Sequence, residues 1–285
     1  MDKKYILLLG FLILAAIIVF AVFKSQGLRR TYKAEVLKGL ERTGKMEQQV
    51  VTEEDIKDLP GPVQKYLRYV GVVGKEKVNN LRITFDGEFK TDTEKDWAKV
   101  DVEQYSFLDD PTRLYFMRLN MSGVPVIGLH HYENGEAMML IKLAGLFTVA
   151  DGRGPEMNQG ETVTVFNDMC LLMPATLIDK RIQWEEIDPL TVKATFENKG
   201  NRISALLYFN EKGELTNFVS DDRYYSPTGT SYQQVRWSTP IKDYKEMNGV
   251  KIVTYGEAIW HFPEGEYCYA KFNVKEIEYN RETYK

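Results

Sequence analysis

Histidine is the side chain that most often serves in acid–base and metal chemistry, and this chain of 285 residues has three. His130 and His131 are adjacent, so on a strand they point to opposite faces and cannot bind one metal ion together. His261 lies far along the chain, and the sequence has no HExxH motif. We therefore predict no metal site and no bound cofactor.

Other catalytic arrangements are equally weak. The sequence has no G-x-S-x-G nucleophile elbow. Asp101 and Glu103 share one face of a predicted strand, but carboxylate pairs of this kind occur on any solvated strand. We predict no catalytic residue, and an unrecognised hydrolase is the least favoured of the functions considered below.

Two arginines suggest a binding role instead. In "TRLYFMRLN", Arg118 follows Leu114 and Phe116 on one face of a strand, so its guanidinium points toward a core or cavity and needs an anionic partner. A ligand carboxylate or phosphate would serve. Arg223, in "SDDRYY", has the same interpretation. The alternative for both is an internal acidic partner or a strand end in water.

Methionine is concentrated in one part of the chain. Because its side chain is flexible and polarizable, methionine is common on surfaces that accept apolar ligands of variable shape. Seven of the ten methionines fall between the third predicted strand and a following helix: Met117, Met121, Met138, Met139, Met157, Met169 and Met173.

The segment "AMMLIKLAGLFTV" is apolar on both faces, whereas a strand of a one-layer sheet needs only one apolar face. One interpretation is a central strand buried between a helix and a second sheet. The other is that Met138 and Leu140 form a pocket wall, with Met139 and Ile141 in the core. The residues that we expect to line such a pocket are Met117, Arg118, Met138, Leu140, Phe147, Phe166, Met169, Met173, Arg223 and Trp260.

The elements that would hold these residues are mostly strands. From Asn80 onward apolar residues alternate with polar ones, and Gly-containing turns separate the runs, which predicts roughly ten to twelve antiparallel strands. One segment, about 161–179, instead has Phe166, Met169 and Met173 at helical spacing, with Pro174 interrupting it. Residues 79–285 are thus predicted to form a mainly β (α+β) domain, a strongly curved antiparallel sheet or half-barrel over one inserted helix.

Residues 28–78 are predicted to be a helical stalk followed by docking helices. Tyr32, Val36 and Leu40 form one apolar face, and Gly44 ends that helix. A second helix, from about Pro62 to Val70, has an apolar face that should dock on the sheet.

Residues 5–23, "YILLLGFLILAAIIVFAVF", carry no charge and would span roughly 28 Å as a helix, close to a bilayer core. We interpret residues 1–27 as an uncleaved N-terminal transmembrane anchor; the alternative is a cleaved signal peptide, for which the cleavage site is poor. Lys24, Arg29 and Arg30 after the span would favour a cytoplasmic domain. A short tail before one span, followed by a β-rich and cysteine-poor domain, is typical of a bacterial signal anchor, so we expect the domain outside the cytoplasm.

Composition narrows the possible partners. The net charge of −4 leaves no basic face for nucleic acid, and two cysteines are too few for a disulfide scaffold.

Several blocks together resemble an uncharacterised bacterial family, a domain of unknown function that usually follows one N-terminal span. They include "LPGPVQKYLRYVGVVGK", "HHYENGEAMMLIKLAGLFTVADGRGPEMNQGE", "DYKEMNGVKI" and "IWHFPEGEYCYAKFNVKEIEYN", within about residues 59–280. Its strand-rich plan is also similar to lipoprotein-carrier folds, in which an open half-barrel covers a helix and holds acyl chains. The resemblance implies no particular substrate or catalytic residue.

The sequence therefore predicts a membrane-anchored binding protein of the bacterial cell envelope for a lipid or other apolar ligand, without catalysis. The alternative from another class is a structural or interaction module of an envelope complex, with the same fold and a filled core.

Overall fold

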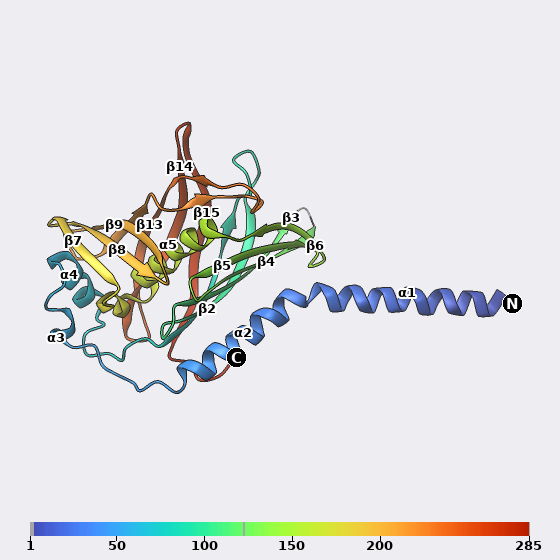
Figure 1. Ribbon diagram of the computed structural model, residues 1–285, viewed down its shortest axis with the longest axis horizontal. Coiled ribbons are helices and arrows are strands. Elements are labelled where there is room, and N and C mark those ends of the chain that lie inside the picture. The colour runs from blue at the N-terminus through green and yellow to red at the C-terminus, as the bar shows by residue number, and fades with distance from the viewer. Residues whose placement is uncertain (1–2, 122, 285) are drawn as a thin grey trace.

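The computed structural model describes residues 3–121 and 123–284 and shows a large curved sheet wrapped around a helix (Figure 1). Strands make up 48% of the chain, and the main sheet has thirteen antiparallel strands and is not closed. The predicted mainly β fold is confirmed. The strand number exceeds the expected ten to twelve, because short strands without clear alternation, such as Phe147–Gly152, give no period-2 signal.

The sheet consists of two meanders joined in its middle. The first meander comprises β1 (Asn80–Phe89), β2 (Ala98–Phe107), β3 (Thr112–Met121), β4 (Val124–Glu133), β5 (Glu136–Leu143) and β6 (Phe147–Gly152). The second comprises β7 (Ile182–Asp188), β8 (Thr191–Asn198), β9 (Asn201–Phe209), β10 (Leu215–Ser220), β13 (Arg236–Met247), β14 (Val250–Phe262) and β15 (Gly265–Tyr279). Strand β1 pairs with β15, so the order is β6 to β1, then β15, β14, β13, then β10 to β7. A separate ribbon pairs β11 (Tyr224–Tyr225) with β12 (Gln233–Gln234).

Helix α5 (Pro155–Leu172) connects the two meanders and lies in the hollow of the sheet (Figure 1). It contacts β4 and β5 on one side and β9 and β10 on the other. The helix begins at Pro155, a residue that suits the first turn of a helix. The preceding residue, Gly154, has a φ of 98°, a conformation that glycine adopts more readily than other residues. A 3₁₀ helix, η1 (Pro174–Ile178), follows directly. The predicted helix and its break at Pro174 are confirmed, and the helix begins earlier than residue 161.

Helix α2 (Gly27–Thr43) packs on the outer face of the first meander. Its buried side chains Tyr32, Val36 and Leu40 meet an apolar cluster from β2, β3 and β4. At its end Arg42 forms ion pairs with Asp109 and with Glu133. The predicted stalk helix, ended at Gly44, is therefore part of the domain and covers the outside of the sheet.

Two shorter helices, α3 (Glu53–Ile56) and α4 (Gly61–Val70), follow α2. Helix α4 buries Val63, Tyr66 and Leu67 in the main core, and the Tyr66 hydroxyl donates to the carbonyl of Cys170 over 2.8 Å. The predicted docking of this helix is confirmed.

Helix α1 (Lys3–Ser25) projects from the domain (Figure 1). Among the described residues one helical stretch, Phe11–Thr43, is long and apolar enough to cross a membrane, and little of its apolar window is buried in the protein.

Candidate functional site

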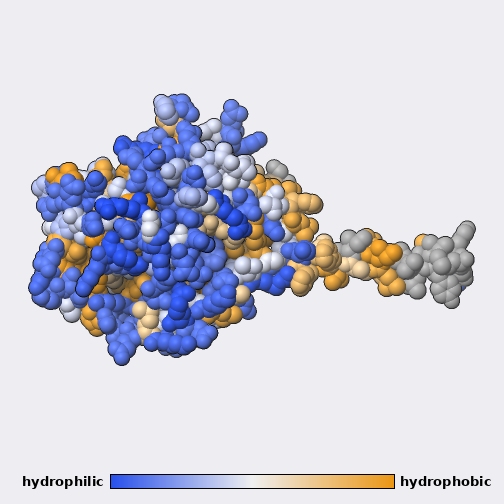
Figure 2. Space-filling view, in the orientation of Figure 1, coloured by the Kyte–Doolittle hydropathy of each residue, from blue (hydrophilic) through white to orange (hydrophobic). Residues whose placement is uncertain are grey.

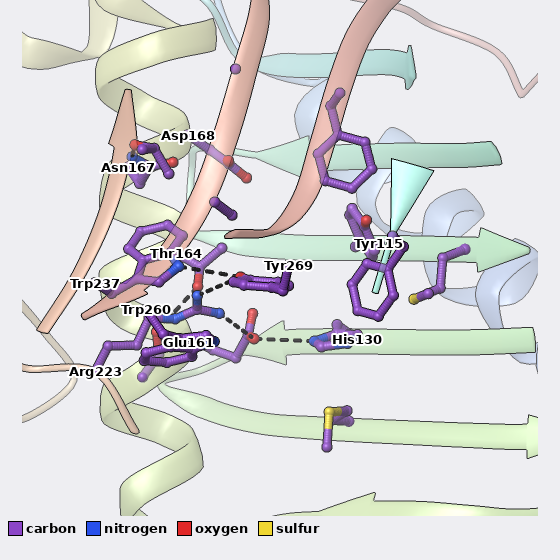
Figure 3. A pocket seen from close by; sticks show the side chains of 18 of the residues that line it. Tyr115, His130, Glu161, Thr164, Asn167, Asp168, Arg223, Trp237, Trp260 and Tyr269 are labelled. Carbon is purple, nitrogen blue, oxygen red and sulfur yellow. Dashed lines mark hydrogen bonds and ion pairs between the residues drawn. The ribbon is translucent and has the colours of Figure 1, made fainter. Parts of the chain in front are cut away.

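A cavity of about 320 Å³ lies between α5 and the inner face of the sheet (Figure 3). Strands β1, β3, β4, β5, β13, β14 and β15 contribute to its wall, together with the segment around β11. A buried cluster of charged and polar side chains lines one end of the cavity, and most of the remaining lining is apolar, with Lys90 and Glu257 also contributing.

Glu161 of α5 is the centre of the polar end. Its side chain is 3% exposed, and Nδ1 of His130 lies 3.1 Å from its Oε1. Arg113 donates to its Oε2 over 3.3 Å, and Nη2 of Arg223 lies 3.8 Å from its Oε1. Two turns further along α5, the carboxylate of Asp168 accepts hydrogen bonds from Arg113 and from Gln104, each over 2.7 Å. A histidine, two arginines and two carboxylates therefore meet in a buried site.

These neighbours decide the charge of Glu161. Burial by itself raises its pKa, but the hydrogen bond from His130 and the charges of His130, Arg113 and Arg223 outweigh burial and lower the pKa to about 2. Burial also acts to lower the pKa of Arg113, and the charges of Asp168 and Glu161 raise it above its usual value. Both groups are ionised at neutral pH.

Arg223 reaches this cluster between aromatic rings. Its guanidinium carbon lies 4.2 Å from the ring centre of Trp237 and 5.3 Å from that of Trp260. Its Nη1 donates to the hydroxyl of Tyr269 over 3.1 Å (Figure 3). Cation–π contacts suit arginine, whose planar cation is weakly hydrated. Its ion pair with Glu161 is long, and its guanidinium donates one hydrogen bond, to Tyr269, among the residues that the structure describes, which leaves donor capacity for a further acceptor at the cavity wall.

The apolar end is formed by side chains from both halves of the sheet. Met117 and Met139 come from the first meander, Met157 from α5, and Phe272 from β15. Phe85 of β1 packs against Phe272 with ring centres 5.7 Å apart. The cavity therefore has the mixed lining of ligand sites, mostly apolar with a few converging polar groups.

The structure places three of the expected pocket residues, Met117, Arg223 and Trp260, in the cavity wall. The faces of β5 are the reverse of the prediction. Met139 and Ile141 line the cavity, whereas Met138 and Leu140 pack on the outer side with the cluster beneath α2. Alternation shows that a strand has two faces, but it does not show which face is the inner one. The outer face of β5 is apolar because α2 covers this side of the sheet, a contact that the β5 segment itself does not reveal.

The remaining expected residues lie outside the cavity. Arg118 is exposed, and Phe147 is 67% exposed at a turn. Phe166, Met169 and Met173 are buried in the core rather than in the cavity wall. Phe166 stacks on Phe196 of β8 with ring centres 5.3 Å apart, because its face of α5 is turned away from the cavity. The helical period was right, and the assignment of its apolar face to the ligand was wrong.

The polar end was missed in the sequence. The buried arginine of β3 is Arg113, which shares a face with Tyr115 and Met117, and not Arg118. A usable signal was present, because Glu161 and Asp168 are seven residues apart and so share one face of the helix that also carries the apolar Phe166 and Met169. An acidic pair in that setting requires buried cations.

The expected separation of the two adjacent histidines is confirmed. His130 lines the cavity, and His131 lies on the other side of the sheet with Glu35 of α2 and Glu133. Ligand atoms of these last three lie within 4.8 Å of one another and are partly exposed. This group lies on the opposite face of the sheet from the cavity cluster and links α2 with β4.

The model of a family described as "Family of unknown function (DUF6544)" matches residues 49–272, which is most of the chain. The chain belongs to this family. The predicted membership of an uncharacterised family is thereby confirmed. No curated protein gives a significant match to this DUF6544 chain.

Three solved structures resemble the DUF6544 chain at low identity. A DUF1329 family protein from Desulfovibrio piger has a TM-score of 0.43 at 10% identity, covering 76% of this chain and 91% of its own. A putative outer membrane lipoprotein-sorting protein domain from Vibrio parahaemolyticus has 0.38 at 9%, covering 70% and 85%. A LolA superfamily protein from Nitrosomonas europaea has 0.38 at 7%, covering 81% and 94%. The last two are named for lipoprotein sorting and for the LolA superfamily, the class of fold that the sequence resembles.

Proposed function

We propose that this DUF6544 protein is a membrane-anchored binding protein for a molecule that is mainly apolar and has one polar end, such as a lipid. In this proposal the protein does not catalyse a reaction. The observation that supports this most is the cavity, whose long apolar wall ends at a buried charged cluster centred on Glu161. Its volume of about 320 Å³ lies within the usual range of small-molecule sites, roughly 300–1,000 Å³.

The charged cluster supports a ligand with a polar end. Burying ions costs more free energy than their attraction commonly returns, so a buried ion cluster is weak evidence of a role in stability. In the apolar interior, Arg223 combines free donor capacity with a position in the cavity wall. A carboxylate, phosphate or hydroxyl head group would accept from Arg223 while an acyl or other apolar part lies against Met117, Met139 and Phe272.

The N-terminal helix supports the location. Helix α1 is apolar, and the exposed side chains that the structure describes on it include Phe11, Leu14 and Phe20. In our proposal α1 is an uncleaved single span, and the β domain lies outside the cytoplasm.

Native mass spectrometry of the full chain, released from detergent, tests the ligand proposal. Wild type should carry an additional mass of acyl-lipid size. Ile141→Trp fills the cavity wall and should lose that mass, whereas Ile187→Trp, at an exposed site on β7, should retain it. Lipid held by α1 alone would be retained by all three proteins, so equal retention would contradict cavity binding. An empty wild type would favour the structural module with the same fold.

A further inference from the structure

Large exposed apolar side chains are concentrated in one place on the domain. Beyond α1, more than half of those that the structure describes lie in, or within three residues of, the turns that join β3 to β4 and β5 to β6. We call these turns the hairpin tips and define them by Met121, Val124, Leu146, Phe147 and Val149. Figure 2 shows apolar atoms gathered where the domain meets α1.

The two turns form one surface. Met121 pairs with Val124 across the first turn, and Leu143 pairs with Phe147 across the second. The amide of Ala144 donates to the carbonyl of Pro125 over 2.7 Å, which joins the turns side by side. Phe147 is 67% exposed and Val149 is 51% exposed. A contiguous apolar patch of this kind on a domain marks an interaction site.

The hairpin tips lie beside the end of α1. Gly145, between the β5 and β6 strands, has φ of 69°, and a Cβ at this position would lie 2.4 Å from the carbonyl oxygen of Ser25. The backbone of the second turn therefore contacts the residue at which α1 ends. A bilayer that contained α1 would end at the level of the hairpin tips (Figure 1).

The charge around this junction suits a bilayer surface. Residues 24–34 contain Lys24, Arg29, Arg30 and Lys33 and no acidic residue. The Arg30 guanidinium carbon lies 3.8 Å from the ring centre of Phe23, and its Nη2 donates to the carbonyl of Phe23 over 2.8 Å, so this cation is held at the end of the apolar helix. Basic side chains next to an apolar patch favour anionic lipid head groups.

We propose that the hairpin tips insert into the boundary between head groups and acyl chains of the same bilayer that α1 crosses. This proposal rests on the membrane anchor in the proposed function, and not on the cavity ligand. The occupant of the apolar patch is then an anionic lipid surface rather than a second copy of the chain or another protein.

The inner face of the sheet connects the hairpin tips with the cavity. Met117 lines the cavity, and Leu119 and Val126 continue the same apolar cluster toward Met121 and Val124. Docked tips would therefore place the apolar end of the cavity on the side of the domain that faces the bilayer.

Fluorescence quenching in nanodiscs tests the contact with the full chain. Nanodiscs of phosphatidylcholine and phosphatidylglycerol are prepared with and without bromine on the upper part of the acyl chains. Phe147→Trp places a tryptophan at the hairpin tips, and Ile187→Trp places one at an exposed apolar site on β7. Subtracting the wild-type signal removes the four native tryptophans.

The added tryptophan of Phe147→Trp should lose emission in brominated nanodiscs, and that of Ile187→Trp should not. Val124→Trp, in the other turn, should behave like Phe147→Trp. Equal emission of Phe147→Trp in both kinds of nanodisc would overturn the proposal and leave the patch to a protein partner or a second copy. A chain that elutes apart from the nanodiscs would overturn the anchor with it. Neither result depends on whether the cavity holds a ligand.

Discussion

Nδ1 of His130 on β4 lies 3.1 Å from Oε1 of Glu161 on α5, so the sheet and the helix meet through a hydrogen bond at the polar end of the cavity. An ionised carboxylate can only accept hydrogen bonds. Glu161 is ionised at neutral pH, because its pKa is lowered to about 2. The hydrogen bond between the two side chains therefore has the N–H of His130 Nδ1 as its donor and the Glu161 carboxylate as its acceptor. The contact thereby defines the orientation of the imidazole in the cavity wall.

Glu161→Gln should strongly destabilise the domain. The amide keeps the size of the side chain but leaves Arg113 and Arg223 without a shared negative charge in a buried site. Breaking a buried ion pair in this way costs roughly 3–5 kcal/mol. Urea denaturation at neutral pH measures the change in the free energy of unfolding. Glu136→Gln is the control, because Glu136 is exposed and makes no ion pair with any residue that the structure describes. A loss no larger than that of the control would contradict the prediction.

The same variant should change the pH dependence of stability. The folded pKa of Glu161 is about 2, below its ordinary value of 4.5, so the stabilisation from its ionised form is complete above about pH 4.5. That stabilisation is lost as the pH falls from about 4.5 toward 2. Wild type and Glu136→Gln should therefore lose unfolding free energy in this window, and Glu161→Gln should lose less. Parallel curves for all three proteins would show that Glu161 is not the group responsible.

Truncation of two methionines distinguishes a ligand cavity from a filled core. Met139 lines the cavity and Met169 is 1% exposed in the core, so truncation of each to Ala removes the same atoms from different surroundings. Met169→Ala should leave a void and cost roughly 2–5 kcal/mol. Met139→Ala should cost the ligand-free protein less than about 1 kcal/mol, because part of its side chain already faces space. Chemical denaturation of both variants checks this, and equal losses would mean that the cavity is filled core.

The fold was largely predictable because its signals are local. Alternation from Asn80 onward indicated antiparallel strands, and the spacing of Phe166, Met169 and Met173 indicated the helix. Which face of each element points inward depends on contacts between distant segments. Leu140 faces outward only because α2, a hundred residues earlier in the chain, covers that side of β5.

The cavity was less predictable for the same reason. Arg113 and Glu161 are 48 residues apart, and their ion pair exists because α5 lies in the hollow of the sheet. Arg223 was identified from its place after two acidic residues, and the structure shows that it meets Trp260 through a cation–π contact. Apolar residues such as Phe166 gave no indication of whether they would meet a ligand or another side chain.

Gly145→Ala should loosen the junction between α1 and the domain. Gly145 has φ of 69° and also contacts the backbone of Ser25, whereas Gly200 has φ of 85° with no atom within 4 Å of an added Cβ. Both Ala variants carry the backbone cost of a positive φ, roughly 1–2 kcal/mol. Only Gly145→Ala should also increase proteolytic cleavage near Ser25 and Gln26 under native conditions. Equal cleavage of the two variants would show that the contact with Ser25 does not hold the junction.

The side of the membrane on which the domain lies can be decided with protease. Lys3 and Lys4 precede the apolar helix, and Lys24, Arg29 and Arg30 follow it, so the charge rule taken alone favours a cytoplasmic domain. We predict export, because one apolar span followed by a β-rich and cysteine-poor domain is typical of a bacterial signal anchor. Protease added to spheroplasts should then remove the domain and leave α1 as a short membrane-bound fragment. A variant with Lys24, Arg29 and Arg30 changed to Gln should give the same fragment, since these charges do not retain an exported domain. If the wild-type domain resists protease until the cells are lysed and the Gln variant becomes accessible, the basic residues hold the domain inside, and the ligand would have to come from the cytoplasmic leaflet.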